Sequence, residues 1–189
     1  FHGHSKQAAA LMALWGLEDP VRMNQEVIEP NGAHGYSTFL GFATLAAKAE
    51  AGDMTGALRD MRDYWGGMLD LGATTFWEDF NLDWAVNASP IDQVVPEGKD
   101  DIHGDFGAYC YKNLRHSLCH AWASGPAPFL AQYVLGVKVL SPGCRKVAVR
   151  PQLGDLTWAE GDYPTPLGPI HIRVEKTESG LKTDVRAPE

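Results

Sequence analysis

The sequence predicts a mainly α-helical protein with a C-terminal antiparallel β part. Up to about residue 138, apolar residues recur at the three- and four-residue spacing of helices that bury one face. After Gly136, apolar and charged residues alternate, with β-branched side chains at every second position, as in half-buried strands. The change of period divides the chain into a long helical region and a short strand region.

The first helices have recognisable start and stop residues. Ser5 is placed to cap a helix over residues 5–17, and residues 20–35 are predicted as a loop because they are rich in Pro, Asn and Gly. A helix over residues 36–51 follows. Gly52 and Asp53 then combine a helix stop with a new N-cap, which indicates a tight helical hairpin.

The second helix of this hairpin is predicted over residues 55–71. Its apolar residues share one face: Leu58, Met61, Trp65, Met68 and Leu69. The charged residues are expected on the solvent side: Arg59, Asp60, Arg62 and Asp63.

The remaining elements are a long loop, a broken helix and several strands. Residues 79–105 lack periodicity and are rich in Asn, Asp, Pro and Gly, and loops of this length are most often functional or disordered. Residues 109–133 are predicted as helix in two pieces, interrupted at Gly125 and Pro126. About four strands, with a hairpin at Ser179 and Gly180, should pair with further strands or pack on helices.

Composition excludes several classes of function. The 189 residues carry a net charge of −8, and no stripe of Lys and Arg could neutralise phosphates, which argues against a nucleic-acid partner. No apolar run approaches the roughly 18 residues that span a bilayer, so no membrane partner is expected. The three cysteines have no metal-binding spacing and are interpreted as buried thiols, and neither a metal site nor a cofactor is predicted.

Glu78 is the first candidate for a catalytic residue. It follows two aromatic residues, and aromatic faces stack on sugar rings while a carboxylate does acid or base work. Trp77 and Trp84 are the candidate stacking residues. The structural alternatives are a Glu that only caps a helix and tryptophans that only pack in a core, which is the interpretation favoured for Trp158.

A glycosidase needs a second carboxylate, and this chain does not visibly supply it. The acids near Glu78 are interpreted as solvated loop residues or as pointing elsewhere: Asp79, Asp83, Asp92, Glu97, Asp100, Asp101 and Asp105. His116 and His120 lie four apart and would share a face of the predicted helix. Such a pair is a weak metal signal without a third ligand, so one of them is expected to contact a hydroxyl group or to be structural.

Several motifs in a common order resemble one enzyme family. They are residues 72–78 (GATTFWE), 117–122 (SLCHAW), 124–126 (SGP), 133–136 (YVLG), 142–143 (PG), 154–156 (GDL) and 164–168 (PTPLG). Together they resemble the C-terminal part of the bacterial α-L-rhamnosidases of glycoside hydrolase family 78.

The resemblance implies an (α/α)6 barrel followed by a β-sandwich. Residues 1–138 would be the last helical hairpins of the barrel, and residues 139–189 would be strands of the sandwich. Hydrolysis would invert the anomeric configuration, with Glu78 as the general base, His120 in contact with the sugar and Trp77 as part of the pocket wall. The substrate would be a rhamnose-containing glycoside or polysaccharide, and the compartment would be the bacterial periplasm or cytoplasm.

The resemblance also implies that this chain holds only half of an active site. The general acid of the family lies upstream of the motifs seen here, so the chain is expected to be inactive without the N-terminal portion of the same enzyme. Two alternatives stay open. One is another (α/α)6-barrel glycosidase with a different sugar specificity, since fold does not fix function. The other is a non-catalytic carbohydrate-binding or assembly module that uses the tryptophans as a platform.

Overall fold

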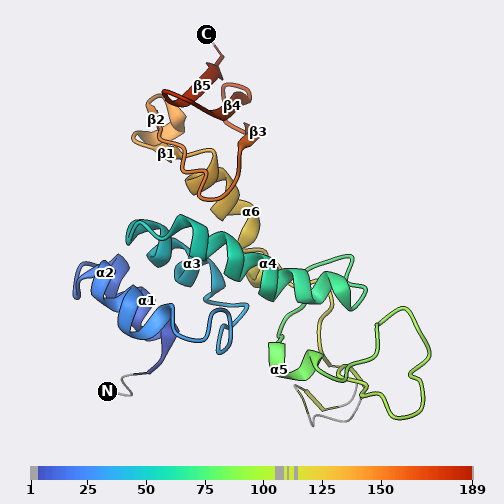
Figure 1. The fold of residues 1–189 in the computed structure, drawn as a ribbon. Coiled ribbons are helices and arrows are strands. Elements are labelled where there is room, and N and C mark those ends of the chain that lie inside the picture. Colours follow the sequence, from blue (N-terminus) through green and yellow to red (C-terminus); the bar gives the residue numbers. More distant parts are fainter. Residues whose placement is uncertain (1–3, 105–108, 110, 113–114, 189) are drawn as a thin grey trace. The chain divides into compact units, whose positions relative to one another are not determined.

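The computed structural model describes residues 4–104, 109, 111–112 and 115–188 (Figure 1). The chain divides into two compact units. The helical unit consists of Phe1–Gly52 and Gly56–Gly125, and the sheet unit consists of Asp53–Thr55 and Pro126–Glu189. In the described part of the chain, no helix combines the length and the apolar character needed to cross a membrane.

The N-terminal region contains more helical segments than the sequence predicts, although its first helix is shorter. Helix α1, Lys6–Leu14, begins at the predicted cap, where the Ser5 hydroxyl accepts a hydrogen bond from the Ala8 amide at 3.2 Å. The predicted loop over residues 20–35 is wrong in its first half, which forms α2, Pro20–Met23, and the π-helical turn η1, Asn24–Ile28. The Asp19 carboxylate caps α2, and a proline at the first helical position favours a helix start.

The helical hairpin is confirmed. Helix α3, Gly41–Glu50, and helix α4, Met54–Asp70, are separated by Gly52, whose φ of 84° is in the left-handed region that favours glycine. Helix α3 starts later than residue 36. Its first residue, Gly41, lies so close to Trp65 that a Cβ atom there would be 2.5 Å from the indole ring.

The prediction that Asp60 faces solvent is wrong. Asp60 and Lys48 are both fully buried, and the Lys48 ammonium lies 2.7 Å from Asp60 Oδ2. The Tyr36 hydroxyl donates a hydrogen bond to the same oxygen at 2.8 Å. Arg59 bridges Asp60, at 2.7 Å, and Glu29, at 2.9 Å, and Glu29 also pairs with Lys48. We call Glu29, Lys48, Arg59 and Asp60 the buried ion cluster, after its two buried members, Lys48 and Asp60; it links the residue after η1 to α3 and α4.

The predicted helix over residues 109–133 is confirmed in its second piece, which opens at Pro126, and is wrong for the described residues 109, 111–112 and 115–120. After the short helix α5, Leu82–Ala85, the next helical turns are the 3₁₀ turn η2, Ala121–Ala123, then α6, Pro126–Phe129, and the π-helical turn η3, Leu130–Val134. Residues 115–120 are not helical because their backbone groups bond to a distant segment, described below. Residues 110, 113 and 114 lie outside the described residues.

The strands of the sheet unit form two antiparallel sheets rather than one. Their bounds are β1, Val137–Val139; β2, Val147–Val149; β3, Trp158–Tyr163; β4, Ile170–Thr177; and β5, Gly180–Arg186. Strands β1 and β2 pair with each other, and β3, β4 and β5 form the second sheet with the predicted hairpin between β4 and β5. Leu135, Val137, Ile170 and Ile172 form the core of the unit.

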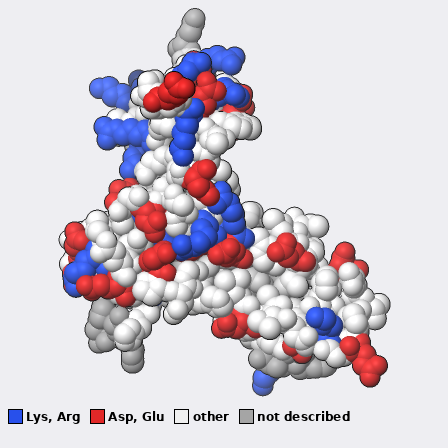
Figure 2. Space-filling view, in the orientation of Figure 1, with Lys and Arg blue, Asp and Glu red and all other residues white. Residues whose placement is uncertain are grey.

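Two expectations about burial are wrong. Trp158 is 55% exposed, because the alternation of β3 places it on the outer face of the sheet with Glu160, and the Arg173 guanidinium lies 5.4 Å from its ring centre. Cys119 is exposed and Cys144, in the 3₁₀ turn η4 (Pro142–Cys144), is half-buried, whereas Cys110 lies outside the described residues. On the face seen in Figure 2, basic side chains lie next to acidic ones.

Candidate active site

Two segments far apart in the sequence lie side by side and bring Glu78 to His120. The Glu78 amide donates a hydrogen bond to the Ser117 carbonyl at 2.8 Å, and the His120 amide donates to the Phe76 carbonyl at 2.8 Å. The Thr75 hydroxyl donates to the Leu118 carbonyl. These bonds satisfy backbone groups that a helix would otherwise pair internally, so residues 117–120 are not helical.

The carboxylate of Glu78 is largely buried and is held at one oxygen. Its side chain is 14% exposed, Oε2 accepts a hydrogen bond from the Ser117 amide at 3.0 Å, and His120 Nδ1 lies 3.9 Å from the same oxygen. Within the described residues, Oε1 makes no hydrogen bond. The site therefore holds the Glu78 carboxylate through Oε2.

Aromatic side chains lie beside Glu78. The His120 and Trp122 rings lie 4.1 Å apart, and the Trp122 and Phe39 rings lie 5.3 Å apart. Trp122 is 45% exposed, and its Nε1 donates to the Glu78 carbonyl at 3.0 Å. The Thr38 hydroxyl donates to that same carbonyl. Sequence reasoning did not select Trp122 as a site residue, although it lies two positions after His120.

Trp77 and Trp84 lie elsewhere than the predicted stacking role implies. Trp77 is 1% exposed and packs edge-on against Phe80 and against His103, with ring centres 5.9 and 4.4 Å apart. Trp84 lies in α5, is half-buried, and has its ring contact with Tyr109 at 6.1 Å. Of the four predicted site residues, the structure thus brings Glu78 and His120 together, whereas Trp77 lies on the buried side of the segment.

His116 does not share a helix face with His120, and this expectation is wrong. Its Nε2 accepts a hydrogen bond from the Asp79 amide at 3.0 Å, and its Nδ1 lies 3.0 Å from Nδ1 of His103. Among the described residues, no group of three His, Cys, Asp or Glu side chains is arranged to hold a metal ion.

The neighbouring carboxylates are engaged away from Glu78. Asp79 is half-buried, its Oδ1 accepts from the Phe80 amide at 2.9 Å, and burial raises the pKa of its carboxyl group. Asp83 pairs with His34 on the surface, and Asp101 accepts from the backbone amides of His103 and Gly104. Asp105 lies outside the described residues.

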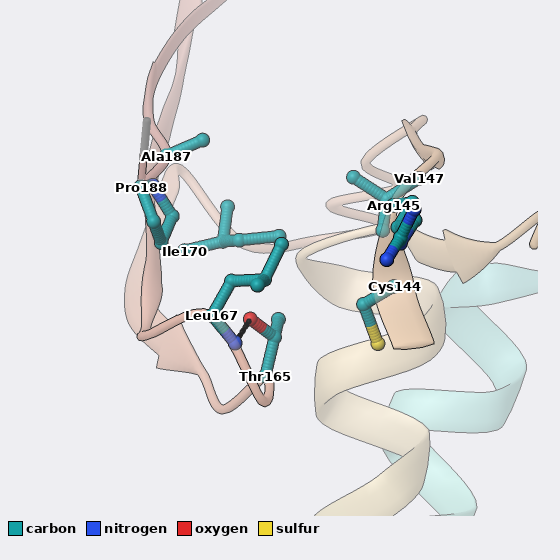
Figure 3. Close-up of a pocket in the computed structure, with 8 residues that line it drawn as sticks. All are labelled: Cys144, Arg145, Val147, Thr165, Leu167, Ile170, Ala187 and Pro188. Carbon is teal, nitrogen blue, oxygen red and sulfur yellow. Dashed lines mark hydrogen bonds between the residues drawn. The ribbon is translucent and has the colours of Figure 1, made fainter. Parts of the chain in front are cut away.

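The sheet unit has a pocket of its own, of about 420 Å³, between β2, the start of β4 and the C-terminal residues (Figure 3). Its described lining is mostly apolar, with the Cys144 thiol, the Arg145 guanidinium and the Thr165 hydroxyl as its polar groups. The Thr165 hydroxyl accepts from the Leu167 amide at 3.2 Å. With neither a carboxylate nor an imidazole in this lining, the pocket lacks the groups that acid or base catalysis uses.

Comparison with known proteins identifies the family. The family described as bacterial alpha-L-rhamnosidase C-terminal domain matches residues 136–189. An alpha-L-rhamnosidase of Alteromonas sp. (strain LOR) is 29% identical over 168 residues, which are 86% of this chain and 16% of that protein. The crystal structure of the family 78 rhamnosidase of Bacillus sp. GL1 superimposes with a TM-score of 0.70 at 30% identity, over 98% of this chain and 18% of that one. The chain belongs to glycoside hydrolase family 78, as the C-terminal part of a rhamnosidase.

A further solved structure supports the fold of this family 78 chain. The alpha-L-rhamnosidase of Streptomyces avermitilis, complexed with L-rhamnose, gives a TM-score of 0.68 at 21% identity, over 97% of this chain and 17% of that one. The family 78 chain spans less than a fifth of the length of each of these relatives. Its helices and two antiparallel sheets match the C-terminal part of the rhamnosidases.

Proposed function

We propose that this chain supplies the general base of an inverting α-L-rhamnosidase, and that Glu78 is that base. The observation that carries the proposal is the placement of Glu78, whose carboxylate is oriented by the Ser117 amide beside His120 and the exposed Trp122 ring. Membership of a family whose named relatives are α-L-rhamnosidases supports the substrate class, a glycoside or polysaccharide with terminal α-L-rhamnose.

The chemistry follows from this placement. A water molecule on one face of the sugar gives a proton to Oε1 of Glu78 while its oxygen attacks the anomeric carbon. The bond from that carbon to the leaving oxygen breaks, and a carboxylic acid on the opposite face protonates the leaving group. His120 would donate a hydrogen bond to a sugar hydroxyl, and the Trp122 ring would cover an apolar face of the sugar. No metal or other cofactor takes part in this scheme.

The proposed acid comes from the N-terminal portion of the same enzyme. The carboxylates of an inverting pair lie roughly 6.5–9.5 Å apart, and the described acids near Glu78 are bonded elsewhere, as shown above for Asp79, Asp83 and Asp101. We infer that residues 1–138 provide the last hairpins of an (α/α)6 barrel and that residues 139–189 provide part of a β-sandwich. The relatives are about six times longer than the matched part, which leaves room for the other half of the barrel.

Two variants of the complete enzyme test this function. Glu78→Gln should lower kcat on an aryl α-L-rhamnoside by about 10²–10⁴-fold, the usual contribution of a positioned base. Glu97→Gln, which changes an exposed loop carboxylate, should leave kcat unchanged. The sugar released first should be β-L-rhamnose, seen by proton NMR before mutarotation. Full activity of Glu78→Gln, or release of the α-anomer, would refute the assignment.

The alternatives predict different results in the same assays. A barrel glycosidase for another sugar would hydrolyse a different aryl glycoside and would still lose activity with Glu78→Gln. A binding or assembly module would bind sugar equally well with Glu78 or Gln at this position. The chain of 189 residues alone should not turn over the aryl rhamnoside, and robust turnover would show that the acid lies within it.

A further inference from the structure

Two consecutive residues, His116 and Ser117, make hydrogen bonds to Glu78 and to the residue that follows it. Ser117 makes two hydrogen bonds with Glu78. Its amide donates to the Glu78 carboxylate, and its carbonyl accepts from the Glu78 amide. The imidazole of His116 accepts the next amide in the chain, that of Asp79, at 3.0 Å. The peptide that joins Glu78 to Asp79 is therefore fixed by a side chain as well as by the backbone.

The geometry determines where the protons of the two imidazoles lie. Because Nε2 of His116 accepts from the Asp79 amide, the proton of the neutral ring must be on Nδ1. Nδ1 of His116 then donates to Nδ1 of His103 at 3.0 Å, so His103 accepts there and carries its own proton on Nε2. The result is a directional chain of hydrogen bonds from Asp79 through His116 to His103, in which both rings are neutral.

A positive charge on either ring would break this series of hydrogen bonds. A second proton on His116 would point at the Asp79 amide hydrogen, and a second proton on His103 would point at the Nδ1 hydrogen of His116. Burial favours the neutral rings, since it lowers the pKa of His103 to about 4 and also lowers the pKa of His116. The rings are stacked 5.1 Å apart, and the charge that His116 would carry further lowers the pKa of His103.

The charged and titratable groups around this pair act in both directions. The carboxylates of Asp79 and Glu78 face His116 and raise its pKa, and Asp101 raises that of His103. His120 acts in the opposite direction on His116. Among the described residues, two aromatic rings also lie against the pair: the Trp77 ring is 4.4 Å from His103 and the Tyr111 ring is 6.1 Å from His116.

We propose that His116, held by His103, is a positioning residue for the catalytic base, and that the pair works as two neutral imidazoles. The proposal rests on the proposed function of Glu78. His116 fixes the peptide after the base through the Asp79 amide, and His103 packs against Trp77, the residue before the base. Neither ring exchanges protons with the substrate. Their role is to keep the carboxylate where it can take a proton from the attacking water, and a 1 Å displacement of such a group costs up to about 10²-fold in rate.

Two substitutions of His116 separate positioning from simple loss of a histidine. In His116→Gln the amide oxygen reaches the place of Nε2 and still accepts from Asp79. In His116→Asn the amide reaches only the place of Nδ1, so the contact with His103 is kept and the acceptor for Asp79 is lost. We expect His116→Gln to keep kcat within a few-fold of the wild type. We expect His116→Asn to lower kcat by about 10–100-fold with KM little changed.

Controls in the complete enzyme distinguish the possible failures. His34→Asn, which changes an exposed histidine, should behave like the wild type. Equal kcat values for His116→Gln and His116→Asn, with Glu78→Gln inactive, would overturn the positioning role and leave the base in place. Full activity of Glu78→Gln would instead overturn the proposed function.

A spectroscopic measurement on the wild-type sequence tests the proposal even if His116→Asn does not fold. Two-bond ¹⁵N–¹H correlation spectra of the 189-residue chain, labelled at its histidines, report the tautomer of each ring. The His116→Gln spectrum assigns the His116 signals. We expect His116 as the Nδ1–H tautomer and His103 as the Nε2–H tautomer, both mainly neutral at pH 6.5, where an ordinary imidazole is half charged. A charged ring, or the Nε2–H tautomer at His116, would overturn the proposal.

Discussion

Replacement of Asp60 by Asn should strongly destabilise the helical unit. Asp60 is fully buried and accepts hydrogen bonds from Tyr36, Lys48 and Arg59. Asn keeps the shape but loses the negative charge, so the fully buried Lys48 ammonium loses the counter-charge that lies 2.7 Å away. Removing one partner of a buried ion pair costs about 3–5 kcal/mol. At about 2–4 °C per kcal/mol for a chain of this size, the melting temperature should fall by roughly 6–20 °C.

The assay is thermal and urea denaturation of the wild type, Asp60→Asn and Asp63→Asn, followed by circular dichroism. Asp63 is exposed three residues further along α4, and its substitution should change the free energy of unfolding by less than about 0.5 kcal/mol. Similar small changes for both variants would refute the argument. That result would mean that the charges of the buried ion cluster are compensated by groups other than Asp60.

Three further predictions concern charge and the site. Arg59 and Lys48 hold the pKa of Glu29 at about 2, below its ordinary 4.5, so its stabilising effect is complete above pH 4.5 and is lost as pH falls toward 2. Melting temperatures of wild type and Glu29→Gln should therefore converge in this range. In the complete enzyme, Trp122→Ala should lower kcat/KM by about 10–100-fold, whereas Trp122→Phe, which keeps a ring, should lose less. Azide added to Glu78→Ala should restore turnover and give a β-rhamnosyl azide, because azide needs no base to attack; an α-azide would contradict inversion.

The helical hairpin could be predicted because its signals are local. Gly52 and Asp53 stop one helix and start the next whatever the rest of the chain does. Asp60 could not be placed in the same way. Its neighbours in sequence make it part of a charged helix face, and only the approach of Lys48 and Tyr36 from other elements makes that position a buried, paired one.

The two tryptophans that were placed wrongly differ in whether the sequence held the signal. Trp158 lies two positions before Glu160 and four before Asp162, so a period of two already puts it on the charged outer face of β3. Trp77 lies in an irregular segment with no period to read. Its burial depends on Phe80 and on His103, which arrives from the far end of a long loop.

The histidines show why half of the site could be predicted and half could not. The pairing of Glu78 with His120 follows from motifs shared with the family, although the predicted helix that carried His120 is wrong. The role of His116 depended on that helix, because a four-residue spacing means a common face only where the backbone is helical. Hydrogen bonds from residues 76–78 replace the helix, and they turn His116 toward Asp79.

Backbone hydrogen bonds also organise the long loop after Glu78. The loop is closed near its middle, where the Ser89 amide donates to the Asp100 carbonyl at 2.9 Å and the Asp100 amide donates to the Asn87 carbonyl at 3.1 Å. The chain therefore leaves the site after Glu78 and returns just before His103. Residues 92–99 form an exposed excursion beyond this closure. The part of the loop that matters to Glu78 is its return, which delivers the imidazole that holds His116.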